Sequence, residues 1–323
     1  MIQVNNLTKI YKTYEKSGNI LTDFFNRQYK QVKAVDNISF QLETNTLVGF
    51  IGPNGAGKTT TMKMLSGILY PSSGTINVLG YNPFEKKPDF LKQIAFIMGQ
   101  KNQLLWELPA TDSFRLNKEI YEIEDNVYKN TVNELVELLN CQSFLSQPVK
   151  TLSLGQRMRL ELINSLLHLP KILFLDEPTI GLDIFAQTTI INFIKEYQNR
   201  YHSSVLLTSH YMQDVQKLAN RIIIVNLGKI IFDGKLMDLI KQFSQEKTVV
   251  ITLNKPISQD FSLPENIEID YNYPLLKLKL KKDEINHILS LILKKCEFVD
   301  LTIEDESIEE IIKKFFKKTS SNR

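Results

Sequence analysis

A glycine-rich stretch at residues 52–59 reads GPNGAGKT and fits the pattern G-x-x-x-x-G-K-[ST]. Its three glycines would let backbone N–H groups converge on phosphate oxygens without obstruction by side chains. A helix that starts at the end of the stretch would point its partly positive N-terminus at the same anion. A tight glycine turn with a chance lysine is the alternative, and the strand and helix expected on either side weigh against it. The pattern predicts a cradle for nucleotide phosphates.

The side chains of this cradle have separate expected roles. Lys58 would reach the β- and γ-phosphates, Thr59 would hold Mg²⁺, and Thr60 would hydrogen-bond the α-phosphate. The full set expected to contact the nucleotide here is Gly52, Pro53, Asn54, Gly55, Ala56, Gly57, Lys58, Thr59 and Thr60.

Two acids close an apolar run at residues 172–177, which reads ILFLDE. A buried strand ending in Asp-Glu places both carboxylates at the carboxyl edge of its sheet, beside the cradle. Asp176 would support Mg²⁺, directly or through water, and Glu177 would polarise the attacking water. An ordinary strand-terminal acidic pair is the alternative. In combination with the cradle, the pair indicates hydrolysis of a phosphate bond.

The elements that must position these residues alternate along the chain. We expect strands at residues 46–51, 75–78, 94–98, 172–175, 205–208 and 221–225, with a helix at 57–66 and further helices between the later strands. Such alternation implies a parallel sheet covered by helices. The stretch from 109 to about 169 is helical in pattern. It predicts an inserted helical subdomain at about 101–168.

The pattern changes around residue 244. Strands are expected at residues 249–253, 275–280 and 298–303, and helices at 284–294 and from Ser307. We therefore expect two domains, 1–243 and a small α+β domain at 244–323.

Composition sets limits on the class of protein. The chain has 323 residues, 43% hydrophobic and 23% charged, as in ordinary folded proteins. The net charge of +3 gives no reason to expect a nucleic-acid partner. Cys141 and Cys296 lie far apart and are expected to be reduced and structural. No window approaches the ~20 apolar residues that span a bilayer, so we expect any membrane role to come through a partner.

The motifs taken together identify a family. The runs GPNGAGKTT, TLSLGQ, ILFLDEPTIGLD and LLTSHYM follow one another along the chain. In this order they resemble the ATP-binding subunit of ABC transporters, over about residues 1–240. The resemblance implies an α/β fold with a P-loop NTPase (RecA-like) core, an inserted helical subdomain, antiparallel strands near the N-terminus and a small α+β appendage. It also implies ATP and Mg²⁺ as cofactors.

Within the family, TLSLGQ is similar to the signature motif, which completes the ATP site of the opposite subunit. Ser153 supplies a hydroxyl, Gly155 allows close approach of the backbone, and the helix that begins there offers another positive N-terminus. Gln156 belongs to the same set. Leu154 stands where the family commonly has glycine. A simple helix cap by Ser153 is an alternative that is compatible with this role.

Four further positions carry over from the resemblance. Tyr11 matches the aromatic residue that stacks on adenine, although a surface tyrosine is an alternative. Gln100 resembles the glutamine that touches Mg²⁺ and hinges the helical subdomain. Asp183 resembles the acid that links the two sites across the interface. His210 resembles the histidine that contacts the γ-phosphate and orients Glu177 and water.

The resemblance implies an ATPase subunit that powers a multi-span membrane permease, as a dimer with itself or a sister subunit. It would be peripheral, at the cytoplasmic face of the cell membrane, and the long insertion is similar to that of a bacterial exporter subgroup. An ABC-type ATPase acting on a soluble macromolecular complex is the alternative. Chains of that kind with two cassettes or long coiled-coil arms differ from this sequence, which has one cradle and no sustained heptads. A P-loop kinase or unrelated NTPase would have no use for TLSLGQ.

Two stretches of the sequence have more than one possible interpretation. Trp106, with Leu104, Leu105 and Leu108, suits a contact with a permease helix or ordinary core packing. The insertion at residues 12–33 carries ILTDFF at helical spacing. It is expected to form a helix, packed on its own domain or against the membrane face or permease, before a strand that begins near Ala34.

Overall fold

A computed structural model describes residues 2–15, 28–99, 101–209, 211–244, 246–257, 264 and 267–321. The chain divides into two compact units, Met1–Gly234 and Lys235–Arg323. The division falls before α9 (Leu236–Phe243), nine residues earlier than the boundary we expected, because α9 packs against α11 (Ile308–Ser321) of the second unit. Their aromatic rings meet edge to face, with the centroids of Phe243 and Phe315 5.3 Å apart.

A six-stranded sheet in the order β5-β6-β7-β3-β8-β9 forms the centre of the first unit. Its strands are β3 (Leu47–Ile51), β5 (Ile94–Met98), β6 (Ile172–Asp176), β7 (Ser204–Thr208), β8 (Arg221–Asn226) and β9 (Lys229–Lys235). The pairs β5–β6, β6–β7, β7–β3 and β3–β8 are parallel. Every residue of β6 and β7 is buried, which explains why these strands read as unbroken apolar runs.

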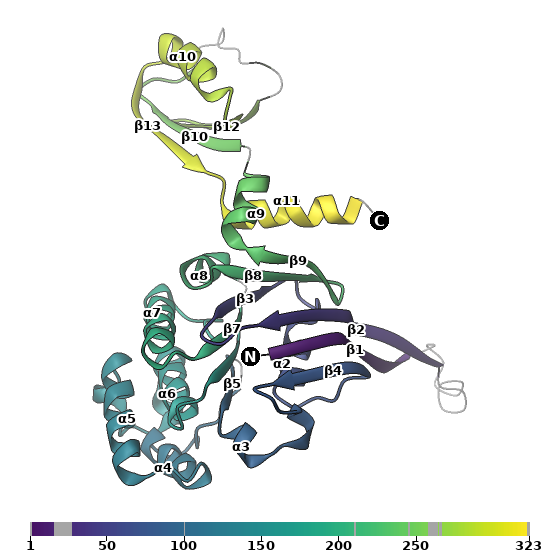
Figure 1. Ribbon diagram of the computed structural model, residues 1–323. Helices are drawn as coiled ribbons and strands as arrows, with labels where there is room; N and C mark the ends of the chain where they lie inside the picture. The colour runs from purple at the N-terminus through teal and green to yellow at the C-terminus, as the bar shows by residue number, and fades with distance from the viewer. Residues whose placement is uncertain are drawn as a thin grey trace, which may run out of the picture. The chain divides into compact units, whose positions relative to one another are not determined.

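Helices cover this sheet. Those next to its strands are α2 (Lys58–Leu65), the short α3 (Pro88–Leu91), α7 (Ile184–Tyr201) and α8 (Met212–Leu218). Between β5 and β6 the chain forms α4 (Ala110–Ile120), α5 (Asp125–Leu138) and α6 (Leu154–Leu166), which group together on one side of the unit (Figure 1). Buried Phe114, Leu135 and Leu162 join these helices into one core with β6 and α7. The expected α/β core with an inserted helical subdomain is confirmed.

A three-stranded antiparallel sheet packs on the same unit, in the order β2-β1-β4. Its strands are β1 (Ile2–Glu15), β2 (Gln28–Leu42) and β4 (Ser73–Val78). Buried Val4 and Phe40 share a core with Phe50 of β3 and Phe174 of β6.

The insertion differs in part from our expectation. Residues 12–15 and 28–33 are not helical but continue β1 and β2 as an antiparallel pair, with Tyr11 opposite Val32 and Thr13 opposite Lys30. Strand β2 therefore begins at Gln28 rather than near Ala34. The reason is the alternation of aromatic and polar residues in this stretch, which suits a strand. The ILTDFF segment lies outside the described residues.

The second unit contains a four-stranded antiparallel sheet in the order β11-β12-β10-β13. Its elements are β10 (Glu246–Leu253), β11 (Glu268–Asn272), β12 (Leu275–Lys281), α10 (Ile285–Lys295), β13 (Phe298–Asp305) and α11. Strand β11 is one that the sequence did not reveal. Alternate residues of β10 and β12, with Ile288 and Ile292 of α10, form a separate hydrophobic core.

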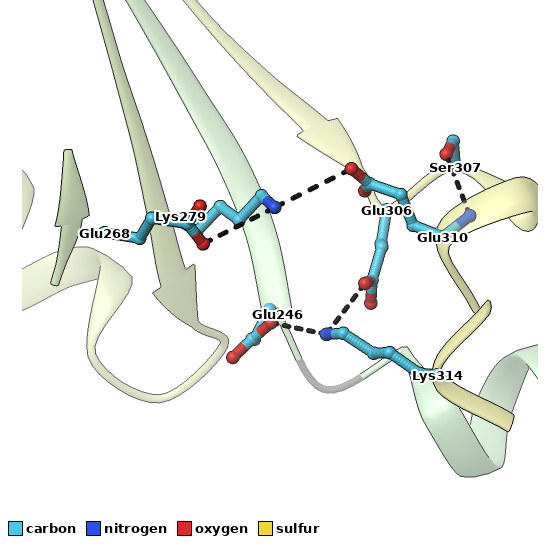
Figure 2. Close-up of polar contacts among 7 residues, drawn as sticks. All are labelled: Glu246, Glu268, Lys279, Glu306, Ser307, Glu310 and Lys314. Carbon is cyan, nitrogen blue, oxygen red and sulfur yellow. Dashed lines mark hydrogen bonds and ion pairs between the residues drawn. The ribbon is translucent and has the colours of Figure 1, made fainter. Parts of the chain in front are cut away.

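Ion pairs fasten α11 to this sheet (Figure 2). Lys314 of α11 pairs with Glu306 at 2.7 Å and with Glu246 of β10. Lys279 of β12 lies 3.7 Å from Glu310 of the same helix. The helix itself starts at a cap, because the Ser307 hydroxyl accepts from the backbone N–H of Glu310 at 3.3 Å. None of the described helices, in either unit, is long and apolar enough to span a membrane.

Candidate active site

The loop between β3 and α2 owes its shape to glycine. Gly55 and Gly57 have φ angles of 76° and 104°, in the left-handed region that disfavours other residues. A Cβ on Gly57 would lie 2.4 Å from the carbonyl oxygen of Ala34, whereas one on Gly55 would meet no atom within 4 Å. Gly57 caps α2 without a side-chain hydrogen bond, so no side chain competes with an anion for the amide groups of the first turn.

Lys58 is the buried cation of this loop, with a relative exposure of 5%. Its Nζ donates to the carbonyl oxygens of Gly52 at 2.7 Å and Pro53 at 3.1 Å. Burial lowers the pKa of Lys58, and the charges of Glu177 and Asp176 oppose that shift. The phosphate loop therefore holds the ammonium group in the same cavity as the two acids at the end of β6, within range of their charges.

Asp176 is held by hydroxyl groups from two other elements. Thr59 of α2 donates to Asp176 Oδ1 at 3.0 Å, and Thr208 at the end of β7 donates to the same oxygen at 2.7 Å. The Thr208 hydroxyl also accepts from the backbone N–H of Glu177 at 3.0 Å. Glu177 has a φ of 54°, so the chain turns sharply out of the strand immediately after Asp176. Thr208 thus fixes both acids, a role that the sequence did not reveal.

A cavity of about 550 Å³ opens over these groups. Our expectation that cradle and acidic pair meet at the carboxyl edge of the sheet agrees with its lining, which includes Lys58, Thr59, Asp176 and Glu177. The lining consists of Ala34, Asn54, Gly55, Ala56, Gly57, Lys58, Thr59, Thr60, Lys63, Met98, Gly99, Lys101, Asp176, Glu177 and Ile180. Gly52 and Pro53 contribute their carbonyl groups to Lys58 instead. The volume is that of an ordinary small-molecule site.

The TLSLGQ stretch forms a capping box at the start of α6. The Ser153 Oγ accepts from the backbone N–H of Gln156 at 3.2 Å, and the Gln156 side chain accepts from the backbone N–H of Ser153 at 2.9 Å. Both side chains therefore stabilise the helix start. Leu154 is 38% exposed and lies over Gly181, since a Cβ on Gly181 would come within 3.3 Å of its Cδ2.

Asp183 lies beside this helix start. It caps α7 by accepting from the backbone N–H of Ala186 at 2.9 Å. A Cβ on Gly155 would lie 2.8 Å from the Cβ of Ala186, so glycine allows α6 and α7 to begin in contact. The structure brings Ser153, Gly155 and Asp183 together, but none of them lines the 550 Å³ cavity.

Comparison with known proteins agrees with this geometry. Residues 35–180 match the family model described as "ABC transporter". The bacitracin transport ATP-binding protein BcrA of Bacillus licheniformis is 32% identical over 212 residues, which is 66% of this chain and 68% of that protein. The ABC transporter ATP-binding protein NatA of Bacillus subtilis (strain 168) is 29% identical over 231 residues, 72% of this chain and 94% of NatA.

The chain belongs to the ABC transporter ATP-binding proteins.

Solved structures show the same fold. A structure described as an ATP-binding subunit of an ABC transporter superposes with a TM-score of 0.62 at 23% identity, over 75% of this chain and 93% of the other. The ATP-binding cassette MJ0796, in a dimer bound to ADP and Pi, gives the same TM-score at 21% identity, over 73% and 99% of the two chains. The family resemblance, the P-loop core and the identification as an ATP-binding ATPase are confirmed.

The remaining predicted site residues of this ATPase have different outcomes. Tyr11 is 38% exposed on β1, with the Lys9 ammonium 5.4 Å from its ring centroid. It does not line the cavity, but its partner Val32 is two residues from Ala34, which does. Gln100 and His210 lie outside the described residues, so their roles stay predictions.

Residues 104–108 separate into buried and exposed parts. Leu104 is 6% exposed and belongs to the core of the helical subdomain. Leu105, Trp106 and Leu108 are 40–46% exposed. The Arg157 guanidinium lies 5.4 Å from the centroid of the Trp106 ring, as in a cation–π contact. The core-packing alternative therefore holds for Leu104 and not for the other three.

The donor set suits a magnesium ion. Thr59 and Asp176 present oxygens 3.0 Å apart at the edge of the cavity. Mg²⁺ is usually held by one or two such protein oxygens, with phosphates and water completing the shell. The described residues contain no cluster of three or more His, Cys, Asp or Glu side chains that would hold a metal alone.

Proposed function

We propose that this ATPase works as half of a dimer that encloses two ATP molecules and drives a membrane permease, with export as the direction of transport. The observation that carries the proposal is the position of Ser153, Gly155 and Asp183. They gather at two adjoining helix starts outside the subunit's own cavity. If these residues bind phosphate, they do so outside the cavity of their own subunit, where a nucleotide held by a second subunit could reach them.

Exposed apolar side chains beside these residues support a subunit interface. Ile184 and Phe185, directly after Asp183, are 78% and 86% exposed. Among the described residues they are the most exposed large hydrophobic side chains, and Leu154, which lies over Gly181, is also exposed. Contiguous apolar surface of this kind marks a contact with another protein. The MJ0796 cassette, with the same fold, is itself described as a dimer.

The capping box leaves Ser153 able to bind phosphate. Its oxygen accepts from Gln156, so its hydroxyl hydrogen is available to donate to an anion. The N-terminus of α6 adds a positive partial charge at the same place. Capping and contact with a partner's γ-phosphate are therefore compatible. In this proposal the Gln156 side chain acts mainly by holding the cap.

Within one cavity, the chain's own residues would divide the work of hydrolysis. Lys58 would neutralise charge on the β- and γ-phosphates, and Glu177 would orient and polarise the attacking water. Thr59, Asp176 and Gln100 would hold Mg²⁺, which neutralises phosphate charge when bound. His210 would orient Glu177, Asp183 would link the two sites, and Tyr11 would stack on adenine. Thr208 keeps both acids in place for these roles.

The permease contact is proposed at the exposed part of residues 105–108. Leu105, Trp106 and Leu108 offer an apolar surface on the helical subdomain. Two relatives that are 32% and 31% identical are named bacitracin transport and linearmycin resistance ATP-binding proteins, which supports transport and favours export. The protein would accordingly be peripheral at the cytoplasmic face of the membrane.

Two variants test the composite site. Glu177→Gln should bind ATP, fail to hydrolyse it and accumulate as a dimer in size-exclusion chromatography. Ser153→Arg, in the Glu177→Gln background, should keep nucleotide binding yet remain a monomer. A Glu177→Gln protein that stays monomeric at saturating ATP would contradict the proposal. So would wild-type hydrolysis per subunit that is independent of protein concentration. Co-purification with a multi-span membrane protein, lost in Trp106→Glu, tests the permease contact separately.

A further inference from the structure

The paired ends of β1 and β2 form a two-stranded ribbon that extends past the rest of its sheet (Figure 1). The third strand, β4, pairs with β1 only as far as Thr8, whereas β1 and β2 stay paired as far as Glu15 and Gln28. All the side chains of residues 11–13 and 29–33 are exposed. Because an isolated two-stranded ribbon is only marginally stable in water, a ribbon with both faces open suits a binding partner.

Each face of the ribbon carries an aromatic ring and a lysine. Directly paired residues share a face, so Tyr11 and Val32 lie on the same face as Thr13 and Lys30. The opposite face carries Lys12, with its partner Gln31, and Tyr29. Tyr29 is 59% exposed and Val32 43%. The two faces therefore have the same chemistry.

The two outer lysines of the ribbon, Lys12 and Lys30, have no acidic partner among the side chains that the structure describes. Lys33, at the base of the ribbon, pairs with Asp36 at 3.3 Å. The sequence of the whole excursion, residues 9–33, holds six Lys or Arg and two Asp or Glu, although the chain of 323 residues has a net charge of only +3. The excursion therefore carries a net charge of +4, whereas the rest of the chain taken together carries −1.

We propose that the ribbon binds the surface of an anionic phospholipid membrane. A groove in a protein would contact one face of the ribbon, whereas a layer of headgroups surrounds both. Tyrosine rings, apolar with a polar tip, suit the level of the headgroups. Lysines close to an anionic leaflet gain about 1 kcal/mol each. This contact belongs to the ATPase subunit itself and requires no permease.

The test is sedimentation of the full-length protein with vesicles. Wild type should bind equimolar phosphatidylglycerol–phosphatidylcholine vesicles at low salt and should be released near 1 M salt, where screening is within ~3 Å. Lys12→Glu with Lys30→Glu should weaken partitioning at least ~30-fold, since two favourable lysines are lost. The matched control is Lys86→Glu with Lys195→Glu, which alters net charge equally at two exposed lysines of the same unit. Thermal melting checks that each variant is folded.

Three results would overturn the proposal. The first is wild-type binding no stronger than that to pure phosphatidylcholine vesicles, which would point to a protein partner for the ribbon. The second is an equal loss in the test and control variants, which would reduce the effect to net charge. The third is release from the vesicles by a stoichiometric single-stranded oligonucleotide, which would indicate a nucleic-acid site. None of these readouts depends on dimer formation or ATP hydrolysis, so the outcome is separate from that of the proposed function.

Discussion

His168 offers a quantitative test of packing between the helical subdomain and the sheet. Its ring stacks on Tyr121 of the segment after α4, with centroids 3.9 Å apart and planes within 4°. The Nε2 atom lies 3.0 Å from the carbonyl oxygen of Ile94 in β5, so Nε2 carries the hydrogen and donates. The other ring nitrogen, Nδ1, is buried and has no hydrogen-bond partner among the described residues. Protonation would bury an unpaired N–H at that atom.

The cost of protonation appears in the pKa. Burial lowers the pKa of His168 to about 4, and the hydrogen bond to Ile94 opposes this only in part. In the unfolded chain the pKa is about 6.5. Between these values the unfolded state binds more protons, so folding stability falls as the pH decreases through this interval. The shifted pKa of His168 makes the free energy of unfolding about 3 kcal/mol larger at high pH than at low pH. About 2 kcal/mol of this is lost between pH 7.5 and pH 5.

Urea unfolding measured through tryptophan fluorescence is the assay. Trp106 is the one tryptophan of the chain and lies in the first unit, so the signal reports the unit that contains His168. Between pH 7.5 and pH 5, the free energy of unfolding should fall by about 2 kcal/mol more in the wild type than in His168→Gln. Glutamine has an N–H for the Ile94 carbonyl and does not titrate. The comparison is between the pH dependences of the two unfolding free energies, so a loss of stability in the variant that is the same at every pH cancels. Parallel pH profiles for the two proteins would refute the reasoning.

Three other predictions concern the site and its supports. Thr208→Val removes the hydroxyl that bonds Asp176 and Glu177, so we expect ATP hydrolysis to be ~10–100-fold slower and nucleotide affinity to stay within a few-fold of wild type. The control is Thr188→Val, whose hydroxyl bonds only the Ile184 carbonyl on an exposed helix face. Unchanged hydrolysis in the first variant would show that Thr208 is dispensable. Gly155→Ala should lower the free energy of unfolding by ~1–3 kcal/mol, because the added methyl group would lie 2.8 Å from the Cβ of Ala186. Adding Ala186→Gly should restore part of this loss, as measured by urea unfolding in a double-mutant cycle. Additive effects would mean that the two helices separate without strain. Finally, burial raises the pKa of Cys141 to about 12, so a thiol reagent at pH 8 should label Cys296 alone in the native protein, and labelling of Cys141 at the same rate would contradict its burial.

Much of the core could be predicted because its signals are local. The buried strands of the parallel sheet are unbroken apolar runs, and β5 has the bounds expected from the sequence, Ile94–Met98. The phosphate loop is equally local, since its glycines, Lys58 and Thr59 are consecutive. Asp176 could be placed because a strand that ends in acids has one orientation in such a sheet.

What could not be predicted depends on neighbours in space. Thr208 acts on the acids only because β7 pairs with β6 in the register that sets it opposite Asp176. Strand β11 has all five residues exposed and so lacks the alternation by which a half-buried strand is recognised. The two ends of the insertion, residues 12–15 and 28–33, were misjudged because the helical spacing at residues 20–25 outweighed the weaker two-residue period of these ends.

Gly99 connects two parts of the ATPase that the sequence keeps far apart. Its backbone N–H donates to the carbonyl oxygen of Asp176 at 3.0 Å, and a Cβ at this position would lie 2.1 Å from the carbonyl oxygen of Glu177. Any heavier residue would push the end of β5 away from the end of β6 and tilt the acids that it supports. A random screen for defective turnover should therefore recover substitutions at position 99 beside those of the acids themselves, although glycine has no side chain to lose.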